Sequence, residues 1–310
     1  MRAITQTSFG DPSVLDLVEV DRPRPGPGQV LIKVGAVGVN PADVAVRAGW
    51  YPVLGEPPFT LGWDVAGVIE LVGSGVSAFE PGEEVFGLLA FPGAGDTYAE
   101  YVLASVNEIA RKPTGLTVER AAGLPLAGLT AWQALVGIGH VGAGDRVLVH
   151  RAAGGVGHLA VQIAKARGAY VIGTAGEANH AWLRELGADE LIDYTATDFV
   201  TATAPVDTVF DLVGGEYGAR SAAALKPGGL LIGALGNNLG ITPEEAGRRG
   251  VRLEVVSVRP SAADLGQLSA LVDAGRLTVH IDQTLPLTEA AKAHDLIATG
   301  HTRGKIVLTP

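Results

Sequence analysis

The segment VLVHRAAGGVGHLA, residues 147–160, has the pattern of a strand that enters a glycine-rich turn and continues as a helix. Its alanine and two glycines stand where the dinucleotide-binding pattern G-x-G-x-x-G has three glycines. The middle glycine lets the backbone approach a pyrophosphate, and the last lets the helix pack closely on the strand. A turn without a ligand is the alternative, but the flanking strand and helix favour binding. The residues expected to bind the phosphates are Ala152, Gly154, Gly155, Val156 and Gly157.

From about residue 121, strand-like runs alternate with helical ones. The runs RVLVH, YVIGT, VDTVFDLV and GLLIGAL are almost entirely apolar, as buried parallel strands are. Helices are predicted at 155–167, 178–186 and 216–225, and Gly168 is expected to end the first. Repeated strand–helix units predict an α/β fold: a doubly wound parallel sheet with helices on both faces.

The first 120 residues differ, because short strand patterns there are separated by Gly/Pro turns. Residues 30–35, WDVAGVIELVGSGV and GEEVFGLLA are the clearest examples. Helical patterns return at 261–275 and 288–299, and GKIVLTP reads as a final strand. The N-terminal segment is therefore expected to be a compact, mainly β domain.

Charge and composition exclude several functions. The chain has 33 acidic and 23 basic residues and no Lys/Arg run, which argues against a nucleic-acid surface. It has no cysteine, so disulfides, thiolate nucleophiles and cysteine-based zinc sites are excluded. No apolar stretch approaches the ~20 residues of a membrane span. The first residues also lack the apolar core of a signal peptide, so a cytoplasmic location is expected.

In several motifs the chain resembles the medium-chain dehydrogenase/reductase superfamily, and within it the zinc-free quinone oxidoreductase branch that includes zeta-crystallin. The resemblance spans nearly the whole chain and depends on the order and spacing of several motifs together. These are GVNPAD (38–43), RAGWYP (47–52), GWDVAGVI (62–69), GDRVLVHRAAGGVGHLAVQIAK (144–165), LGADELIDY (186–194), LKPGGLLIGAL (225–235) and RGKIVL (303–308). The resemblance implies a GroES-like catalytic domain at 1–120 and 259–310 and a Rossmann-type dinucleotide-binding domain at 121–258.

The resemblance also suggests how the chain works without a metal. Zinc-bearing relatives have a cysteine ligand where this chain has Asn40, a His-Glu pair at Trp63-Asp64, and a third ligand position near Leu126. Without a Lewis acid, alcohol oxidation is not expected, whereas hydride addition to an electron-poor quinone or enone needs only hydrogen-bond donors. The residues matching the edge of the nicotinamide pocket are Tyr51, Asn40 and Thr130.

Each of these three residues also has a structural reading. Tyr51 could be a packed aromatic, Asn40 could cap a turn, and the hydroxyl of Thr130 could bond back to a helix carbonyl. In the reductase reading, Tyr51 is the proton donor, because a phenol O–H can donate to the developing negative charge.

NADP(H) is the expected cofactor, because no Asp or Glu ends the strand YVIGT to bind a ribose 2′-hydroxyl. His180 and Arg184 could neutralise a 2′-phosphate, while Glu177 weakens the preference. The resemblance adds residues beyond the glycine turn to the cofactor site: Thr174, Gly176, His180, Tyr194, Leu235 and Gly236.

Two other functions remain open. One is an enoyl-thioester reductase, and the other is a non-catalytic, crystallin-like nucleotide-binding protein. A homodimer is expected because this branch commonly pairs through the edge of the nucleotide-binding sheet, here near GLLIGALG and VRLEVVSV. His150 and His158 flank the glycine turn without an assigned role, and the role of Arg151, where relatives carry a small residue, is also open.

Overall fold

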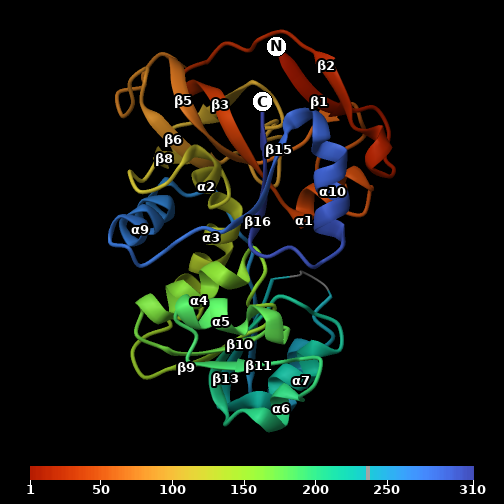
Figure 1. Cartoon of the computed structure of the whole chain (residues 1–310), viewed down its shortest axis with the longest axis vertical. Helices are drawn as coiled ribbons and strands as arrows, with labels where there is room; N and C mark the ends of the chain where they lie inside the picture. Colours follow the sequence, from red (N-terminus) through yellow and green to blue (C-terminus); the bar gives the residue numbers. More distant parts are fainter. Residues whose placement is uncertain (235–237) are drawn as a thin grey trace. The chain divides into compact units, whose positions relative to one another are not determined.

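The computed structural model describes residues 1–234 and 238–310, and the chain divides into two compact units. The first unit consists of Met1–Leu129, Arg259–Gly275 and Val279–Pro310. The second consists of Thr130–Val258 and Arg276–Thr278. The first unit is therefore built from both ends of the chain, and in Figure 1 the blue C-terminal elements lie among the red and orange N-terminal ones.

The first unit is mainly β. Its strands are β1 (Arg2–Gln6), β2 (Asp16–Glu19), β3 (Gln29–Val39), β4 (Phe59–Thr60), β5 (Asp64–Val72), β6 (Glu84–Leu88), β7 (Tyr101–Ser105), β8 (Ile109–Arg111), β15 (Ile281–Pro286) and β16 (Lys305–Thr309). Its α-helices are α1 (Pro41–Arg47), α2 (Val118–Ala122), α9 (Ala262–Asp273), α10 (Ala290–Ala298) and α3 (Pro125–Trp132), which continues into the second unit. Short 3₁₀ turns lie at Pro12–Val14 and Leu287–Glu289.

Strand β3 is the centre of the larger sheet of this unit. The strand order is β15-β16-β3-β5-β6-β8, and β7 also pairs with β3. Strand β5 passes β3 so closely that a Cβ added at Gly67 would lie 2.2 Å from the carbonyl oxygen of Lys33. On the other side, β16 pairs antiparallel with the end of β3, with Ile306 opposite Val39. The last strand of the chain is thereby fixed beside the end of β3.

The second unit contains a six-stranded parallel sheet in the order β11-β10-β9-β12-β13-β14. Its strands are β9 (Arg146–Val149), β10 (Tyr170–Thr174), β11 (Glu190–Ile192), β12 (Val206–Asp211), β13 (Leu225–Gly233) and β14 (Arg252–Val255). Its helices are α4 (Gly157–Ala166), α5 (His180–Glu185), α6 (Phe199–Ala202), α7 (Tyr217–Ala224) and α8 (Pro243–Arg248), with a 3₁₀ turn at Glu177–Asn179 and a π-helical segment at Gln133–Ile138.

This strand order confirms the predicted doubly wound fold. Numbered along the chain, the strands run 3-2-1-4-5-6, the order typical of dinucleotide-binding sheets. Figure 1 shows α4 and α5 on one side of the sheet and α6 and α7 on the other. The sheet strands are buried between these layers, which explains their nearly continuous apolar sequence. Helix α4 ends as expected, because Gly168 follows it with a φ of 88° that favours glycine.

Two further features concern the expected dimer contact and the question of a membrane-spanning helix. Strand β14 lies at one edge of the six-stranded sheet, in the segment expected to carry a dimer contact. Within residues 1–234 and 238–310, no helix combines the length and the apolar character required to cross a membrane.

Candidate active site

The glycine turn lies at the carboxyl end of β9, where the strand order reverses between β9 and β12. Ligands of open α/β sheets bind at such reversal points. A Cβ added at Gly157 would lie 2.2 Å from the carbonyl oxygen of Arg151, so only glycine fits at the start of α4. Ala152 is fully buried and does not have a positive φ, so alanine is tolerated at the first position of the pattern. The turn and the N-terminus of α4 fit a pyrophosphate.

Arg151 adopts the left-handed backbone conformation in this turn, with a φ of 52°. A non-glycine residue in this region is strained, at a typical cost of about 1–2 kcal/mol. Glycine, which has no Cβ, would relieve that strain. The arginine is therefore a tolerated departure from the residue that this conformation favours. Its side chain is exposed.

The buried side chain of His150 supports the backbone of the turn, a role that the sequence did not reveal. It is fully buried; its Nδ1 lies 3.1 Å from Oγ1 of Thr174 and its Nε2 lies 3.1 Å from Oγ of Ser221. Burial, together with the positive charge of Arg220, lowers the pKa of His150 to about 3, so the ring is neutral. One nitrogen therefore donates and the other accepts, linking β9 to β10 and α7. The hydroxyl of Thr174, expected in the cofactor site, is engaged in this link.

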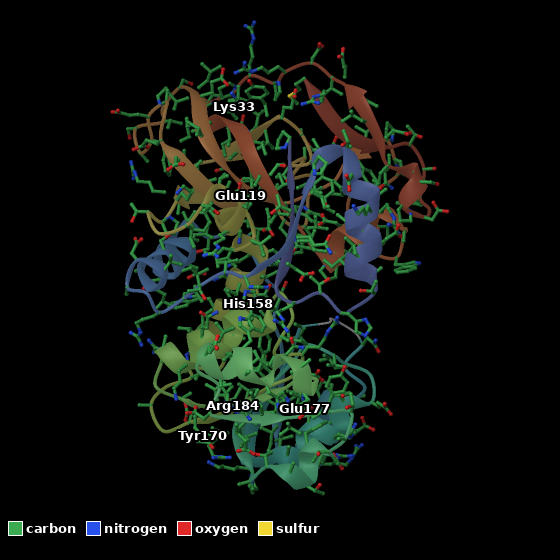
Figure 2. The ribbon with its side chains drawn as sticks, in the orientation of Figure 1. Lys33, Glu119, His158, Tyr170, Glu177 and Arg184 are labelled. Carbon is green, nitrogen blue, oxygen red and sulfur yellow. The ribbon has the colours of Figure 1, made fainter. Side chains whose placement is uncertain are left out.

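The residues after β10 are arranged as a short polar segment. Gly176 has open space around it, since a Cβ added there would meet nothing within 4 Å. His180 Nε2 lies 3.0 Å from the carbonyl oxygen of Ala175 and donates to it. Glu177 begins the 3₁₀ turn and is exposed, as is Arg184 in the last turn of α5 (Figure 2).

The remaining expected cofactor residues are Tyr194, Leu235 and Gly236. Tyr194 follows β11 with 51% of its surface exposed, so its ring is available to a ligand. Leu235 and Gly236 lie outside the described residues. His158 is buried, stacks on Trp182 and lies 2.9 Å through Nδ1 from the carbonyl oxygen of Gly154. It therefore supports the start of α4 from within.

In the first unit, Asn40 belongs to a buried polar cluster. It lies between the end of β3 and the start of α1, and only 3% of it is exposed. Its Nδ2 donates to Oδ2 of Asp64 at 2.9 Å, and its Oδ1 accepts from Nζ of Lys305. The ammonium also donates to the carbonyl oxygen of Val39 at 3.1 Å, while Oδ1 of Asp64 accepts from the backbone N–H of Leu126 at 2.7 Å. The side-chain amide of Asn40 is therefore bound at its oxygen by Lys305 and at its nitrogen by Asp64.

A second buried carboxyl, Asp43, adjoins this cluster and accepts from the backbone N–H of Asn40 at 2.7 Å. Burial raises the pKa of Asp43 to about 7, even though the hydrogen bond from the Asn40 backbone acts in the opposite direction. Beyond it, Nε2 of His294 lies 3.2 Å from the hydroxyl of Tyr98, and its Nδ1 lies 3.4 Å from a guanidinium nitrogen of Arg47. Because arginine only donates, Nδ1 of His294 accepts, and its Nε2–H donates to the oxygen of Tyr98. The hydroxyl proton of Tyr98 is then directed at Asp43. Burial accordingly lowers the pKa of His294 to about 3.

The remaining two expected catalytic residues lie in different units. Tyr51 follows α1, is 38% exposed, and its backbone N–H donates to the carbonyl oxygen of Ala45 at 3.1 Å. Asn40 and Tyr51 thus flank the two ends of one short helix. Thr130 lies in α3, is 8% exposed, and belongs to the second unit.

The positions that match zinc ligands in relatives do not fit zinc here. Asn40 is held by Lys305 and Asp64, and the indole N–H of Trp63 donates to the carbonyl oxygen of Gly93 at 2.6 Å. An indole N–H is no metal ligand, and a buried ammonium beside Asp64 would repel a dication. In the described part of the chain, no group of three His, Cys, Asp or Glu residues could hold a metal ion.

Two family models match the chain: an alcohol dehydrogenase GroES-like domain at residues 26–114 and a zinc-binding dehydrogenase at residues 186–308. A quinone oxidoreductase of Pongo abelii is 34% identical over 324 residues, covering 99% of this chain and 97% of that protein.

Solved structures are also similar over the full chain. The quinone oxidoreductase from Coxiella burnetii is 41% identical with a TM-score of 0.94, covering 100% of this chain and 99% of the other. A mycobacterial protein complexed with NADPH is 34% identical with a TM-score of 0.89, and both chains are covered completely. The CurK enoyl reductase is 28% identical with a TM-score of 0.90, covering 99% of this chain and 98% of that one.

The left-handed φ of Arg151 predicts a stability difference between two substitutions. Arg151→Gly and Arg151→Ala both remove the arginine side chain, but only glycine removes the Cβ strain. We expect the glycine variant to be more stable than the alanine variant by about 1 kcal/mol. Denaturant unfolding of the two proteins measures the difference, and a glycine variant less stable than the alanine variant would contradict the strain.

The raised pKa of Asp43 predicts a pH dependence of stability. Between about pH 4 and pH 7 the folded carboxyl holds a proton that the unfolded one releases, so this group makes stability fall as the pH rises through that window. Asp43→Asn removes the titration, while its amide oxygen can still accept from Asn40. The variant should lose less stability than the wild type between pH 5 and pH 8 in denaturant unfolding.

Asp11→Asn is the control. Hydrogen bonds from Ser13 lower the pKa of Asp11, so the effect of its titration on stability falls below the range from pH 5 to pH 8. Equal pH dependence of the wild type and Asp43→Asn would show that the buried carboxyl does not titrate there.

Proposed function

The chain belongs to the zinc-free quinone oxidoreductase branch of the medium-chain dehydrogenase/reductase superfamily, and from that premise we propose that it reduces a quinone or an α,β-unsaturated carbonyl with NADPH, without a metal. It is an oxidoreductase with a nicotinamide cofactor. The proposal concerns the acceptor, the NADPH preference and the independence from zinc.

One observation carries this proposal. At the position of a metal ligand in zinc-bearing relatives, the chain has an amide, Asn40, held against the buried ammonium of Lys305. Zinc activates an alcohol by making its alkoxide, and an amide beside an ammonium has no such ability. An amide N–H can instead donate to an oxygen that becomes negative, which is what reduction of an enone or quinone requires.

The second unit supports binding of the cofactor. The glycine turn and the N-terminus of α4 would hold the pyrophosphate, and His180, Gly176 and Tyr194 would border the adenosine phosphate and ribose. When bound, the reduced nicotinamide supplies the hydride. His150 links the end of β9 to Thr174 on β10 and to Ser221 on α7, which would hold the turn in place for the cofactor.

The first unit would supply the donors. A hydride added at the β-carbon of an enone leaves an electron pair that appears as negative charge on the carbonyl oxygen. Tyr51, whose hydroxyl has no hydrogen-bond partner within the described chain, would donate the proton, and Asn40 would donate a hydrogen bond. The family resemblance adds Thr130, in the second unit, as a third candidate residue.

A second function, reduction of an enoyl thioester, is favoured by the similarity to the CurK enoyl reductase. The chemistry is the same, because a thioester carbonyl also activates a C=C bond for hydride addition. Turnover of a free enone compared with turnover of its thioester distinguishes the two substrates: preference for the thioester by both kcat and KM would favour the second function.

The expected cofactor preference is for NADPH. No carboxylate ends β10, and His180 in the first turn of α5, whose Nε2 is bound to Ala175, would meet a 2′-phosphate through Nδ1. In a fluorescence titration of metal-stripped protein, NADPH should bind more tightly than NADH. His180→Ala should weaken NADPH binding while leaving NADH binding unchanged. Equal or tighter binding of NADH would overturn the preference and would make Glu177 the candidate ribose ligand.

Tyr51→Phe tests the proton donor. Loss of one donor in a preorganised site typically lowers the rate by ~10²–10³, so kcat for an enone at saturating NADPH should fall within that range. The loss should be smaller for a quinone, which is the stronger acceptor, and the affinity for NADPH should not change. Val53→Ala in the same loop is the control. An unchanged kcat for the enone would leave Tyr51 as a surface aromatic.

A further inference from the structure

Lys305 is buried to an extent that is rare for a lysine. Only 4% of it is exposed, and it lies at the start of β16, where that strand pairs with the end of β3. Buried lysines are normally paired, and this ammonium meets the carbonyl oxygen of Val39, the amide oxygen of Asn40 and, at 3.5 Å, Oδ2 of Asp64. Its three protons therefore have acceptors on β3, on the residue after β3 and on β5.

These contacts determine which way the Asn40 amide faces. An ammonium can only donate, so the oxygen of the amide must face Lys305 and the nitrogen must face Asp64. One N–H of the amide is bound to Asp64. Its second N–H has no hydrogen-bond partner among residues 1–234 and 238–310, which leaves it available to an acceptor.

The carboxylate in this cluster is itself fixed. Oδ1 of Asp64 accepts from the N–H of Leu126 at 2.7 Å, at the start of α3. A Cβ added at Gly38 would lie 2.5 Å from Oδ2 of Asp64, so glycine on β3 creates the room that Asp64 occupies. Asp64 is fully buried, and both of its carboxylate oxygens are hydrogen-bonded.

We propose that Lys305 and Asp64 are positioning residues for the reduction: they fix the Asn40 amide with an N–H directed at the acceptor, and the ammonium strengthens that N–H as a donor. This inference rests on the proposed function. A cation on the amide oxygen draws electron density from the nitrogen, and charge-assisted hydrogen bonds are roughly twice as strong as neutral ones. Lys305 thereby acts on the acceptor through Asn40 without touching it.

The test uses the ratio of two rates. Lys305→Met keeps an unbranched side chain one atom shorter and removes the charge, and kcat is measured at saturating NADPH with one enone and one quinone. The enone needs the donor more, so the enone-to-quinone ratio of kcat should fall roughly 10-fold, in the range typical of residues that orient a catalytic group. A structural defect lowers the active fraction for both substrates equally and leaves the ratio unchanged.

Two further variants keep the test decisive. Lys305→Met leaves Asp64 buried without its cation, so Lys305→Met/Asp64→Asn is made as well and should show the same fall in the ratio even if the single variant does not fold. Lys33→Met is the matched control, because this lysine is exposed on β3, the strand that pairs with β16 (Figure 2), and its loss should leave the ratio unchanged.

A double-mutant cycle shows whether Lys305 acts through Asn40. In an Asn40→Ala background, Lys305→Met should cause no further fall in the ratio, because the group that it positions is gone. An equal fall in both backgrounds, or an unchanged ratio in the wild-type background, would overturn the inference while leaving the proposed function intact. A wild-type protein that oxidises NADPH with neither acceptor would overturn the proposed function, and this inference with it.

Discussion

The pairing of the Lys305 ammonium with Asp64 and Asn40 constrains the whole first unit. A buried charge without a partner is costly, and removing one member of a buried pair typically costs about 3–5 kcal/mol. Lys305 begins β16, Asp64 begins β5 and Asn40 directly follows β3, so these contacts can form only when the C-terminal strand has returned to the N-terminal sheet. The register of Ile306 opposite Val39 brings Lys305 to Asn40. The candidate donor site is therefore complete only when both ends of the chain segment forming this unit are paired.

In the second unit, the candidate phosphate-binding turn is stabilised by a neutral side chain. The turn that would bind a pyrophosphate needs an open backbone, and it is stabilised from below by His150 rather than by a charge. Burial keeps the pKa of His150 low, so the ring stays neutral and adds no positive charge to the floor of the turn. The contrast with Lys305 is chemical: the candidate phosphate site would use N–H groups and a helix dipole, whereas the proposed donor site would use an amide polarised by an ammonium.

Sequence patterns predicted the fold well, because the local signals agreed with the tertiary structure. The apolar runs became the strands of a parallel sheet, and Gly168 ended α4. Gly157 could be recognised because its spacing from Gly154 follows a known pattern. Family resemblance pointed to Asn40, but its surroundings could not be predicted, since Lys305 and Asp64 lie 241 residues apart in sequence. The role of His150 was missed for the same reason: its partner Ser221 lies 71 residues away.

The central claim is that this chain reduces an activated C=C bond or a quinone by direct hydride transfer without a metal. The most direct measurement uses metal-stripped protein, NADPH deuterated at the transferred position of the nicotinamide, and an enone acceptor in a single turnover. The account predicts one deuterium at the β-carbon of the product and the same rate with or without a chelator. A product free of deuterium, or activity that returns only when zinc is added, would contradict it.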